Sequence, residues 1–291
     1  CGARGVRGLL LLTAGFSETG GSGREKQAEI TALARSYGMR LIGPNCLGVL
    51  NTDPAVRLNA TFAGLPMQPG GLGLVSQSGA LGIAVVAAAA RCGLGISQFV
   101  SIGNKADVSG NDLLLFWEQD PSTQVCLLYL ESFGNARRFA RIAARVSRTK
   151  PIVAITAGRS QAGARGVRSH TAAAATPAVA LDALFAKSGV ISAASMSEAM
   201  DVTGLLTRSP LPAGRRVAVV TNGGGPGALA ADACAAVDLE LPELSSAVRT
   251  KLERVLPAHA STVNPVDTTA GGTPQVLAAA SEILLECNDI D

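Results

Sequence analysis

The sequence has very few aromatic residues and few charged ones. Aromatic side chains make up 3% of the 291 residues and charged ones 16%, whereas 47% are hydrophobic. So low a charged fraction excludes a disordered chain, and the cores must be built from Ala, Val, Leu and Ile. The formal net charge is only +3, and few rings are available to stack on bases. The composition therefore argues against nucleic-acid binding.

Cysteine motifs and long apolar runs are also missing. The six cysteines are widely spaced without a CxxC pair, which gives no zinc signal and suits reduced thiols in a reducing compartment. No apolar run approaches the roughly 20 residues that cross a bilayer, and Leu9–Leu12 is too short for a signal peptide. We therefore expect a soluble, cytoplasmic protein with no metal site and no membrane partner.

Strand-like and helix-like segments alternate along the chain, whose length suits two or three domains. We predict the tail of an α/β unit in residues 1–65, a central α/β domain in residues 66–210 and a partial third α/β unit in residues 211–291. Prolines mark a linker over residues 51–70. Because the outer units have few strands and the chain does not begin with Met, we expect a piece of a longer polypeptide.

The central segment has the clearest pattern. Buried strands are predicted at residues 73–75, 96–101, 125–130 and 151–156. Helices are predicted at residues 80–91, 136–148, 176–187 and 197–207, and another helix is predicted to begin at residue 112. Strands that alternate with helices predict a parallel sheet covered on both faces. Repeated right-handed crossovers make this a flavodoxin-like, doubly wound fold of the α/β class, and we predict a partial second flavodoxin-like domain in residues 211–291.

The segment Ser76–Ala80 follows a predicted strand and opens a helix. Free backbone N–H groups and the helix dipole make such a junction an anion site, so Ser78 and Gly79 are candidate phosphate-binding residues. The alternative is ordinary N-capping by Ser78 with a tight turn at Gly79. The glycine-rich segment Asn222–Gly227 has the same placement in the third unit, and there a glycine-dependent turn is the alternative.

Glu131 ends the predicted strand at residues 125–130 and should lie at the carboxyl edge of the sheet. Ligands collect at that edge in doubly wound folds. A carboxylate there can hold a histidine in one tautomer or stabilise its cationic form. The alternatives are a contribution to a helix N-terminus or a solvated turn.

His170 is one of only two histidines and closes a segment rich in glycine and alanine. We predict a small-residue loop here, with Arg159, Arg165 and Arg168 favouring an anionic ligand. Imidazole is one of the few side chains that can accept a phosphoryl group and pass it on near neutral pH. The alternative is an ordinary surface histidine.

Six motifs occur along the chain. Each motif alone is a weak indication of a family, but the whole set in this order is highly specific. The set resembles the NDP-forming acyl-CoA synthetases, relatives of the succinyl-CoA synthetase alpha subunit. The resemblance implies that residues 1–65 end a Rossmann-like CoA-binding domain. Similar sequences also occur fused to Gcn5-type acetyltransferase domains. The motifs are Gly43–Gly48, Val75–Gly82, Tyr129–Ser132, Ala157–Ser160, Ser169–Thr171 and Thr221–Gly227.

The resemblance implies a role for each candidate site residue. His170 matches the histidine that is phosphorylated by acyl phosphate, and Glu131 matches the carboxylate that orients it. Ser78 and Gly79 match the helix start that holds phosphate. Three further residues match segments near the CoA thiol and the acyl group, namely Asn45, Cys46 and Asn104.

The implied reaction interconverts acyl-CoA, ADP and phosphate with an acid, CoA and ATP. Coenzyme A is then a substrate, and ATP or ADP with Mg²⁺ would bind an ATP-grasp region outside this chain. We expect such a partner and also a homo-oligomer, because truncated units leave sheet edges open. The alternative is an acyl-CoA-sensing regulatory module of a protein lysine acetyltransferase in which the ligase chemistry is vestigial.

Overall fold

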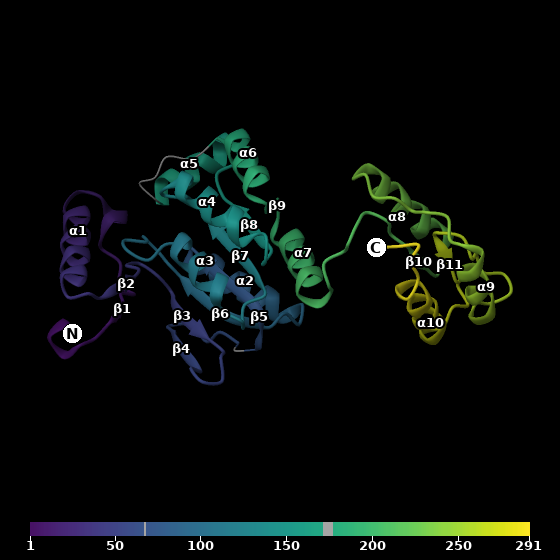
Figure 1. Cartoon of the computed structure of the whole chain (residues 1–291). Coiled ribbons are helices and arrows are strands. Elements are labelled where there is room, and N and C mark those ends of the chain that lie inside the picture. Colours follow the sequence, from purple (N-terminus) through teal and green to yellow (C-terminus); the bar gives the residue numbers. More distant parts are fainter. Residues whose placement is uncertain (67, 171–176) are drawn as a thin grey trace. The chain divides into compact units, whose positions relative to one another are not determined.

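The computed structural model describes residues 1–66, 68–170 and 177–291. The chain forms two compact units, Cys1–Ser209 and Pro210–Asp291, whose elements are labelled in Figure 1. Each unit has an α/β fold with its own buried apolar core.

The first unit begins with a small β-α-β arrangement. Strands β1 (Gly8–Leu10) and β2 (Arg40–Ile42) pair in parallel, and helix α1 (Gly21–Ser36) connects them. Two short 3-10 helices, η1 (Gly2–Arg4) and η2 (Ser17–Thr19), precede α1.

A seven-stranded sheet dominates the first unit, with the order β4-β3-β6-β5-β7-β8-β9. The strands from β6 to β9 in this order pair in parallel, whereas β3 and β4 are antiparallel additions at one edge. The strands are β3 (Gly48–Asn51), β4 (Leu58–Thr61), β5 (Pro69–Ser76), β6 (Ile96–Ser101), β7 (Val125–Leu130), β8 (Ile152–Thr156) and β9 (Val190–Ala193). Part of the segment predicted as a linker is therefore strand β4.

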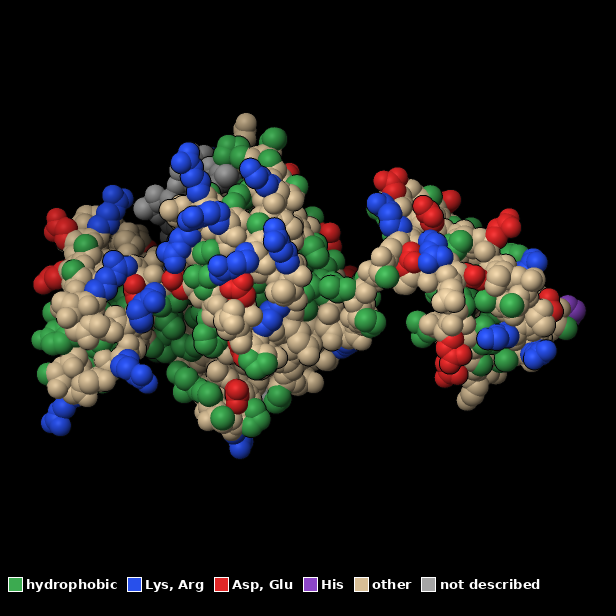
Figure 2. Space-filling view, in the orientation of Figure 1, with side chains coloured by type: hydrophobic (Ala, Val, Ile, Leu, Met, Phe, Trp, Pro, Cys, Tyr) green, Lys and Arg blue, Asp and Glu red, His purple; other side chains and the backbone are tan. Residues whose placement is uncertain are grey.

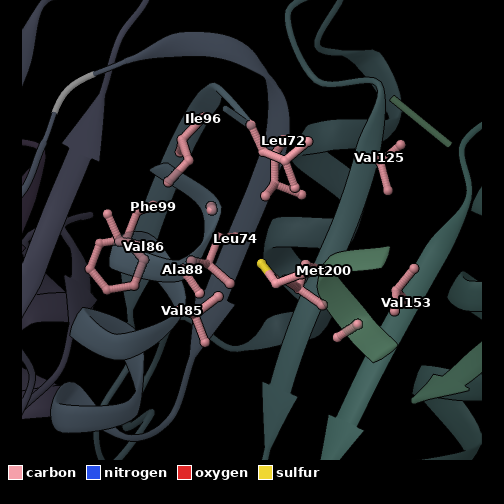
Figure 3. Close-up of a cluster of buried hydrophobic side chains, with 14 of the residues drawn as sticks. Leu72, Leu74, Val85, Val86, Ala88, Ile96, Phe99, Val125, Val153 and Met200 are labelled. Carbon is pink, nitrogen blue, oxygen red and sulfur yellow. The ribbon is translucent and has the colours of Figure 1, made fainter. Parts of the chain in front are cut away.

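Helices cover both faces of this sheet, as the apolar strands predict. On one face α2 (Gly79–Arg91) and α7 (Met196–Arg208) pack against the strands, and Figure 3 shows Leu72, Leu74, Val85 and Met200 in that cluster. On the other face the helices surround the fully buried Trp117. They are α3 (Gly110–Gln119), α4 (Ala136–Val146) and α6 (Ala178–Ser188). The doubly wound prediction is confirmed.

The segment before residue 171 is helical, so the prediction of a small-residue loop there was wrong. Helix α5 spans Gln161–His170, and the Ser160 Oγ accepts a hydrogen bond from the Gly163 N–H at 3.0 Å. This cap satisfies a donor of the first turn. Each glycine within a helix costs only about 1 kcal/mol relative to alanine. The two internal glycines therefore weaken the helix without preventing it.

The second unit contains a two-stranded parallel sheet, β10 (Val220–Thr221) with β11 (Val266–Asp267). Its helices are α8 (Gly224–Ala236), α9 (Ser246–Val255) and α10 (Pro274–Leu285). Buried Leu252, Val266 and Leu284 belong to its core. Helix α8 starts at Gly224, inside the glycine-rich segment Asn222–Gly227.

Candidate functional site

The carboxyl ends of three adjacent strands bring most of the candidate residues together. Strand β5 lies between β6 and β7, and the three strands end at Ser76, Ser101 and Leu130. Because the three strands are parallel, the loops that follow them meet at one edge of the sheet. These loops carry Ser78 and Gly79, Asn104, and Glu131 respectively.

Ser78 is the N-cap of helix α2. Its Oγ accepts a hydrogen bond from the Leu81 N–H at 3.3 Å, and the Ser76 Oγ donates to the Ser78 carbonyl at 2.6 Å. The Ser78 side chain therefore acts as an ordinary helix N-cap, as in the alternative interpretation. Helix geometry leaves the first N–H groups of α2 without intrahelical acceptors and places the positive end of the dipole there. An oxyanion bound at Gly79 would accept hydrogen bonds from these N–H groups and would be stabilised by the positive end of the dipole.

Gln77 holds the Glu131 loop beside this helix start. The buried Gln77 side chain accepts two backbone hydrogen bonds at Oε1, from the Glu131 N–H at 2.6 Å and from the Ser132 N–H at 2.9 Å. The Gln77 N–H in turn donates to the Tyr129 carbonyl at 3.2 Å. The Glu131 backbone is therefore bound to the residue that directly precedes Ser78, the N-cap of α2. Sequence reasoning missed Gln77, although it stands between two residues of the recognised motif.

Lys105, in the loop after β6, contacts the Glu131 loop. Its Nζ donates to the Ser132 carbonyl at 2.5 Å and to the Ser132 Oγ at 2.6 Å. Burial lowers the pKa of the Lys105 ammonium from 10.5 to about 8, and the negative charge of Glu131 partly opposes this shift. Sequence reasoning also missed Lys105, and its only signal was its place directly after Asn104.

The side chains of Asn45 and Asn104 are in contact. The Asn45 Nδ2 donates to the Asn104 Oδ1 at 3.3 Å, and the Asn104 N–H donates to the Pro44 carbonyl at 2.9 Å. The Asn104 Nδ2 also donates to Glu18 at 2.5 Å and to Gln27 at 3.0 Å. The Asn104 amide therefore joins the loop after β6 to the segment that leads into α1.

Cys46 is buried in the turn next to Asn45. Its Sγ lies 3.4 Å from the Leu11 carbonyl oxygen, and burial raises the pKa of the Cys46 thiol to about 11. The thiolate is the reactive form of cysteine. Cys46 therefore packs the turn and is not an activated nucleophile.

Cys46 is expected to resist alkylation. With a pKa of about 11, its thiolate fraction at pH 8 is about one in a thousand, and the side chain is also buried. Cys92 is exposed and serves as the internal control. Brief iodoacetamide treatment followed by peptide mass spectrometry should modify Cys92 at least about 100-fold faster. Equal rates at the two thiols would contradict the buried position.

Asp107 ties the N-terminal β-α-β arrangement to the same loop. Its side chain is 6% exposed and accepts hydrogen bonds from Arg35, from the Arg40 Nε at 2.8 Å and from the Leu41 N–H at 3.0 Å. Burial alone raises the pKa of Asp107, but these hydrogen bonds outweigh it and hold the pKa below 3.8. The turn carrying Asn45 is thereby fixed relative to Asn104.

Replacing Asp107 with Asn is expected to lower the free energy of unfolding by about 1–3 kcal/mol at pH 7, because charged hydrogen bonds are lost. The folded pKa is depressed, so this stabilisation is full above the unfolded value of 3.8 and is lost as the pH falls through the folded value. Urea unfolding at pH 7 and below pH 3 measures the difference. Asp182→Asn, at a more exposed ion pair, should have an effect below about 1 kcal/mol.

His170 is the last residue of α5. Its side chain and residues 171–176 lie outside the described residues, so its contacts with Ser78 or Glu131 belong to the proposal below. Arg159 does not stand free for an anion, because its guanidinium donates to Asp182 at 2.5 Å and to Ser192 at 3.2 Å. Its positive charge is thus offset by α6.

A hollow lined by basic side chains lies along α4. Its accessible volume is about 630 Å³, and its lining includes Arg137, Arg138, Arg141 and Lys187. Basic side chains gather over this part of the first unit in Figure 2. Arg138 also pairs with Asp112 of α3 at 3.4 Å. The charge of this hollow is therefore partly neutralised within the unit.

In the second unit, the segment Asn222–Gly227 joins β10 to α8. The Gly223 N–H donates to the Thr221 Oγ1 at 3.2 Å, and α8 begins at Gly224. Within the described parts of both units, no group of three or more His, Cys, Asp or Glu side chains is placed to hold a metal ion. None of the described helices is long and apolar enough to cross a membrane.

Comparison with known proteins decides the family. Residues 69–206 match the succinyl-CoA ligase-like flavodoxin domain, and residues 217–290 match the ligase-CoA domain. The whole chain is 38% identical to acetate–CoA ligase (ADP-forming) II subunit alpha of Pyrococcus furiosus and covers 63% of it. The chain belongs to the NDP-forming acyl-CoA synthetase family. The resemblance read from the ordered motifs is confirmed.

Other relatives of this synthetase family agree in fold and name. The chain is 39% identical over its whole length to acetate–CoA ligase (ADP-forming) I of Archaeoglobus fulgidus and covers 42% of it. A solved structure, the dinucleotide-forming acetyl-coenzyme A synthetase 1 of Candidatus Korarchaeum cryptofilum with phosphate and ADP, superposes with a TM-score of 0.93 at 39% identity. That match covers all of this chain and 62% of the solved one. The chain thus spans less than two thirds of these relatives.

Proposed function

We propose that this chain performs the acyl- and phosphoryl-transfer steps of an NDP-forming acyl-CoA ligase, an acid–thiol ligase of the acetate type. The ligase interconverts acyl-CoA, ADP and phosphate with an acid, CoA and ATP through a phosphohistidine at His170. The observation that carries this proposal is that Gln77 fixes Glu131 beside the start of α2. A carboxylate that orients a histidine and an oxyanion-binding helix start are the two parts that phosphoryl transfer needs.

The first step is phosphorolysis of the thioester. Phosphate held at Ser78 and Gly79 attacks the acyl carbonyl carbon, a C–O bond forms, and the C–S bond breaks to release CoA. The acyl end of CoA would lie near the turn that holds Asn45 and Cys46, with Asn104 in the loop opposite. The positive end of α2 stabilises the charge on the attacking phosphate and on the oxyanion that forms at the carbonyl oxygen before the CoA thiolate leaves.

The second step moves the phosphoryl group to the protein. A neutral His170 nitrogen attacks the phosphorus of the acyl phosphate, an N–P bond forms, and the acid leaves as its carboxylate. Glu131 holds the imidazole in the tautomer that exposes the attacking nitrogen and stabilises the cationic product. The phosphoryl group then passes to ADP, and every step is reversible. Positioning and charge stabilisation account for most of the catalysis in such transfers.

The remaining parts belong to the whole protein. The P. furiosus relative is named as an alpha subunit, which supports a partner subunit or domain of the ATP-grasp type that binds ADP or ATP with Mg²⁺. The proposal includes three domains, in residues 1–65, 66–210 and 211–291. It also includes assembly into a homo-oligomer and a location in the cytoplasm. A fused Gcn5-type acetyltransferase domain would support the regulatory alternative, which the ligase names of the relatives do not favour.

The proposal is tested with full-length protein, acetyl-CoA and ³²P-labelled phosphate, with no nucleotide present. We expect label on the wild-type protein that is stable in base and labile in acid, as for phosphohistidine. His170→Asn should carry no label, whereas His259→Asn, at an exposed histidine of the other unit, should be labelled normally. A folded wild-type protein without label, or a labelled His170→Asn variant, would refute the carrier role.

A further inference from the structure

Lys105 adopts a backbone conformation that is unusual for its residue type. Its φ is +48°, in the left-handed region, which costs a residue with a Cβ roughly 1 kcal/mol or more. The turn is fixed by hydrogen bonds from the Lys105 N–H to the Ile102 carbonyl at 2.8 Å and from the Ala106 N–H to the Gly43 carbonyl at 3.1 Å. Strain of this kind persists where the surrounding structure holds it, often at functional sites.

The Lys105 side chain completes a clamp on the segment Glu131–Ser132. Two acceptors of Ser132, its carbonyl and its Oγ, bind the Lys105 Nζ at 2.5 and 2.6 Å. Gln77 also accepts both backbone N–H groups of the segment and donates its Nε2 to the Ser132 Oγ at 3.4 Å. The backbone that carries the Glu131 carboxylate is therefore held by two side chains from two neighbouring strand ends.

A neutral donor would satisfy the Ser132 acceptors at a lower cost. Burial disfavours the charged form of Lys105, while Glu131 favours it. Retaining an ammonium group in a buried position is costly unless its charge is used. A positive charge next to Glu131 offsets the repulsion between that carboxylate and an arriving phosphate, since opposite charges a few ångströms apart attract strongly in a partly buried site.

We propose that Lys105 is a positioning residue for Glu131, which acts through Ser132 together with Gln77 and keeps the carboxylate at a fixed place beside the start of α2. This inference rests on the proposed function, because it gives Glu131 its role toward His170. It adds a residue to the site that the ordered motifs did not contain.

The test compares Lys105→Met, Lys105→Arg and Lys150→Met in the full-length protein. Lys150 is the matched control, because its Nζ also donates to two backbone carbonyls, those of Trp117 and Asp120, at the opposite end of the strands. The first measurement is hydrogen exchange of the Glu131 and Ser132 amides by mass spectrometry. We expect Lys105→Met to raise their exchange rates by about 10-fold or more, since a charged hydrogen bond is lost, and Lys150→Met to leave them unchanged.

The second measurement is the rate of labelling from acetyl-CoA and ³²P-labelled phosphate. Lys105→Met is expected to lower the maximal rate by about 10- to 100-fold without a matching change in the apparent KM for acetyl-CoA. Lys105→Arg, which keeps the charge and the donors, should restore most of the rate and of the amide protection. Ser132→Ala, which removes only one acceptor, gives an intermediate effect and replaces Lys105→Met if that variant does not fold.

The two measurements separate failure of this inference from failure of the proposed function. Unlabelled wild-type protein refutes the phosphohistidine, and the exchange measurement then still decides whether Lys105 holds the loop. Wild-type exchange and labelling in Lys105→Met and Ser132→Ala would overturn the inference. An equal loss of labelling in Lys150→Met would also overturn it, because general destabilisation would then explain the effect.

Discussion

Glu131→Gln is expected to lower the rate of phosphohistidine formation by about 100- to 10,000-fold, the range seen when the group that orients a catalytic histidine loses its charge. The Gln side chain has nearly the same shape as Glu. Its amide can donate as well as accept a hydrogen bond, so it does not select one imidazole tautomer, and without a negative charge it does not stabilise the imidazolium cation. The substitution leaves the hydrogen bond from the backbone N–H of residue 131 to Gln77 in place. Labelling with acetyl-CoA and ³²P-labelled phosphate measures the loss.

The control for this experiment is Glu198→Gln. The Glu198 carboxylate accepts the Ala194 N–H at 2.7 Å at the start of α7, so it is a structural carboxylate in the same unit. We expect wild-type labelling for Glu198→Gln and an unchanged thermal midpoint for Glu131→Gln. Labelling of Glu131→Gln within about threefold of the wild type would remove Glu131 from the proposed mechanism.

Gly103→Ala is expected to destabilise the first unit by about 3 kcal/mol or more, well above the effect of the left-handed backbone alone, which is about 1–2 kcal/mol. Gly103 has a φ of +50°, and a Cβ added there would lie 2.2 Å from the carbonyl oxygens of both Pro44 and Asn45. These are backbone atoms and cannot swing aside. The two loops would have to separate and break the Asn104–Pro44 hydrogen bond.

Gly134→Ala isolates the cost of the backbone conformation. Gly134 has a similar φ of +64°, but a Cβ there meets nothing within 4 Å. Urea unfolding of the two variants, followed by a signal from the buried Trp117, measures the difference in free energy of unfolding. Equal destabilisation of the two variants would show that the loops after β2 and β6 do not pack backbone to backbone.

The main sheet was predictable because its strands are short apolar runs between helix-like segments. Strands β6, β7 and β8 match their predicted ranges within a residue. Three strands of the sheet were missed. Strand β3 is only four residues long and leads into the segment taken as a linker, β4 is exposed at its first residues, and β9 follows a helix after a single residue, Gly189. The prediction also failed at α5, where glycine and alanine content was taken as a loop signal although Ser160 caps a helix there.

The candidate site likewise contains some residues that could be proposed from the sequence and others that could not. Ser78 and Glu131 could be proposed because they closely follow predicted strands, whereas Asn104 was proposed only because the ordered motifs resemble a known family. Gln77 and Lys105 could not, because their importance comes from partners that lie 54 and 27 residues away in the chain. A single glutamine or lysine in a loop has no local pattern that distinguishes a clamp from a solvated side chain.

By itself the sequence determined the alternation of strands and helices, the doubly wound sheet and the family, because hydrophobic periodicity and ordered motifs are local properties of the chain. Only the tertiary structure decided which side chains meet at the carboxyl edge. There Gln77 and Lys105 hold the Glu131 loop, and Asp107 fixes the turn at Asn45. These contacts depend on strand order, and strand order is set by packing between distant segments.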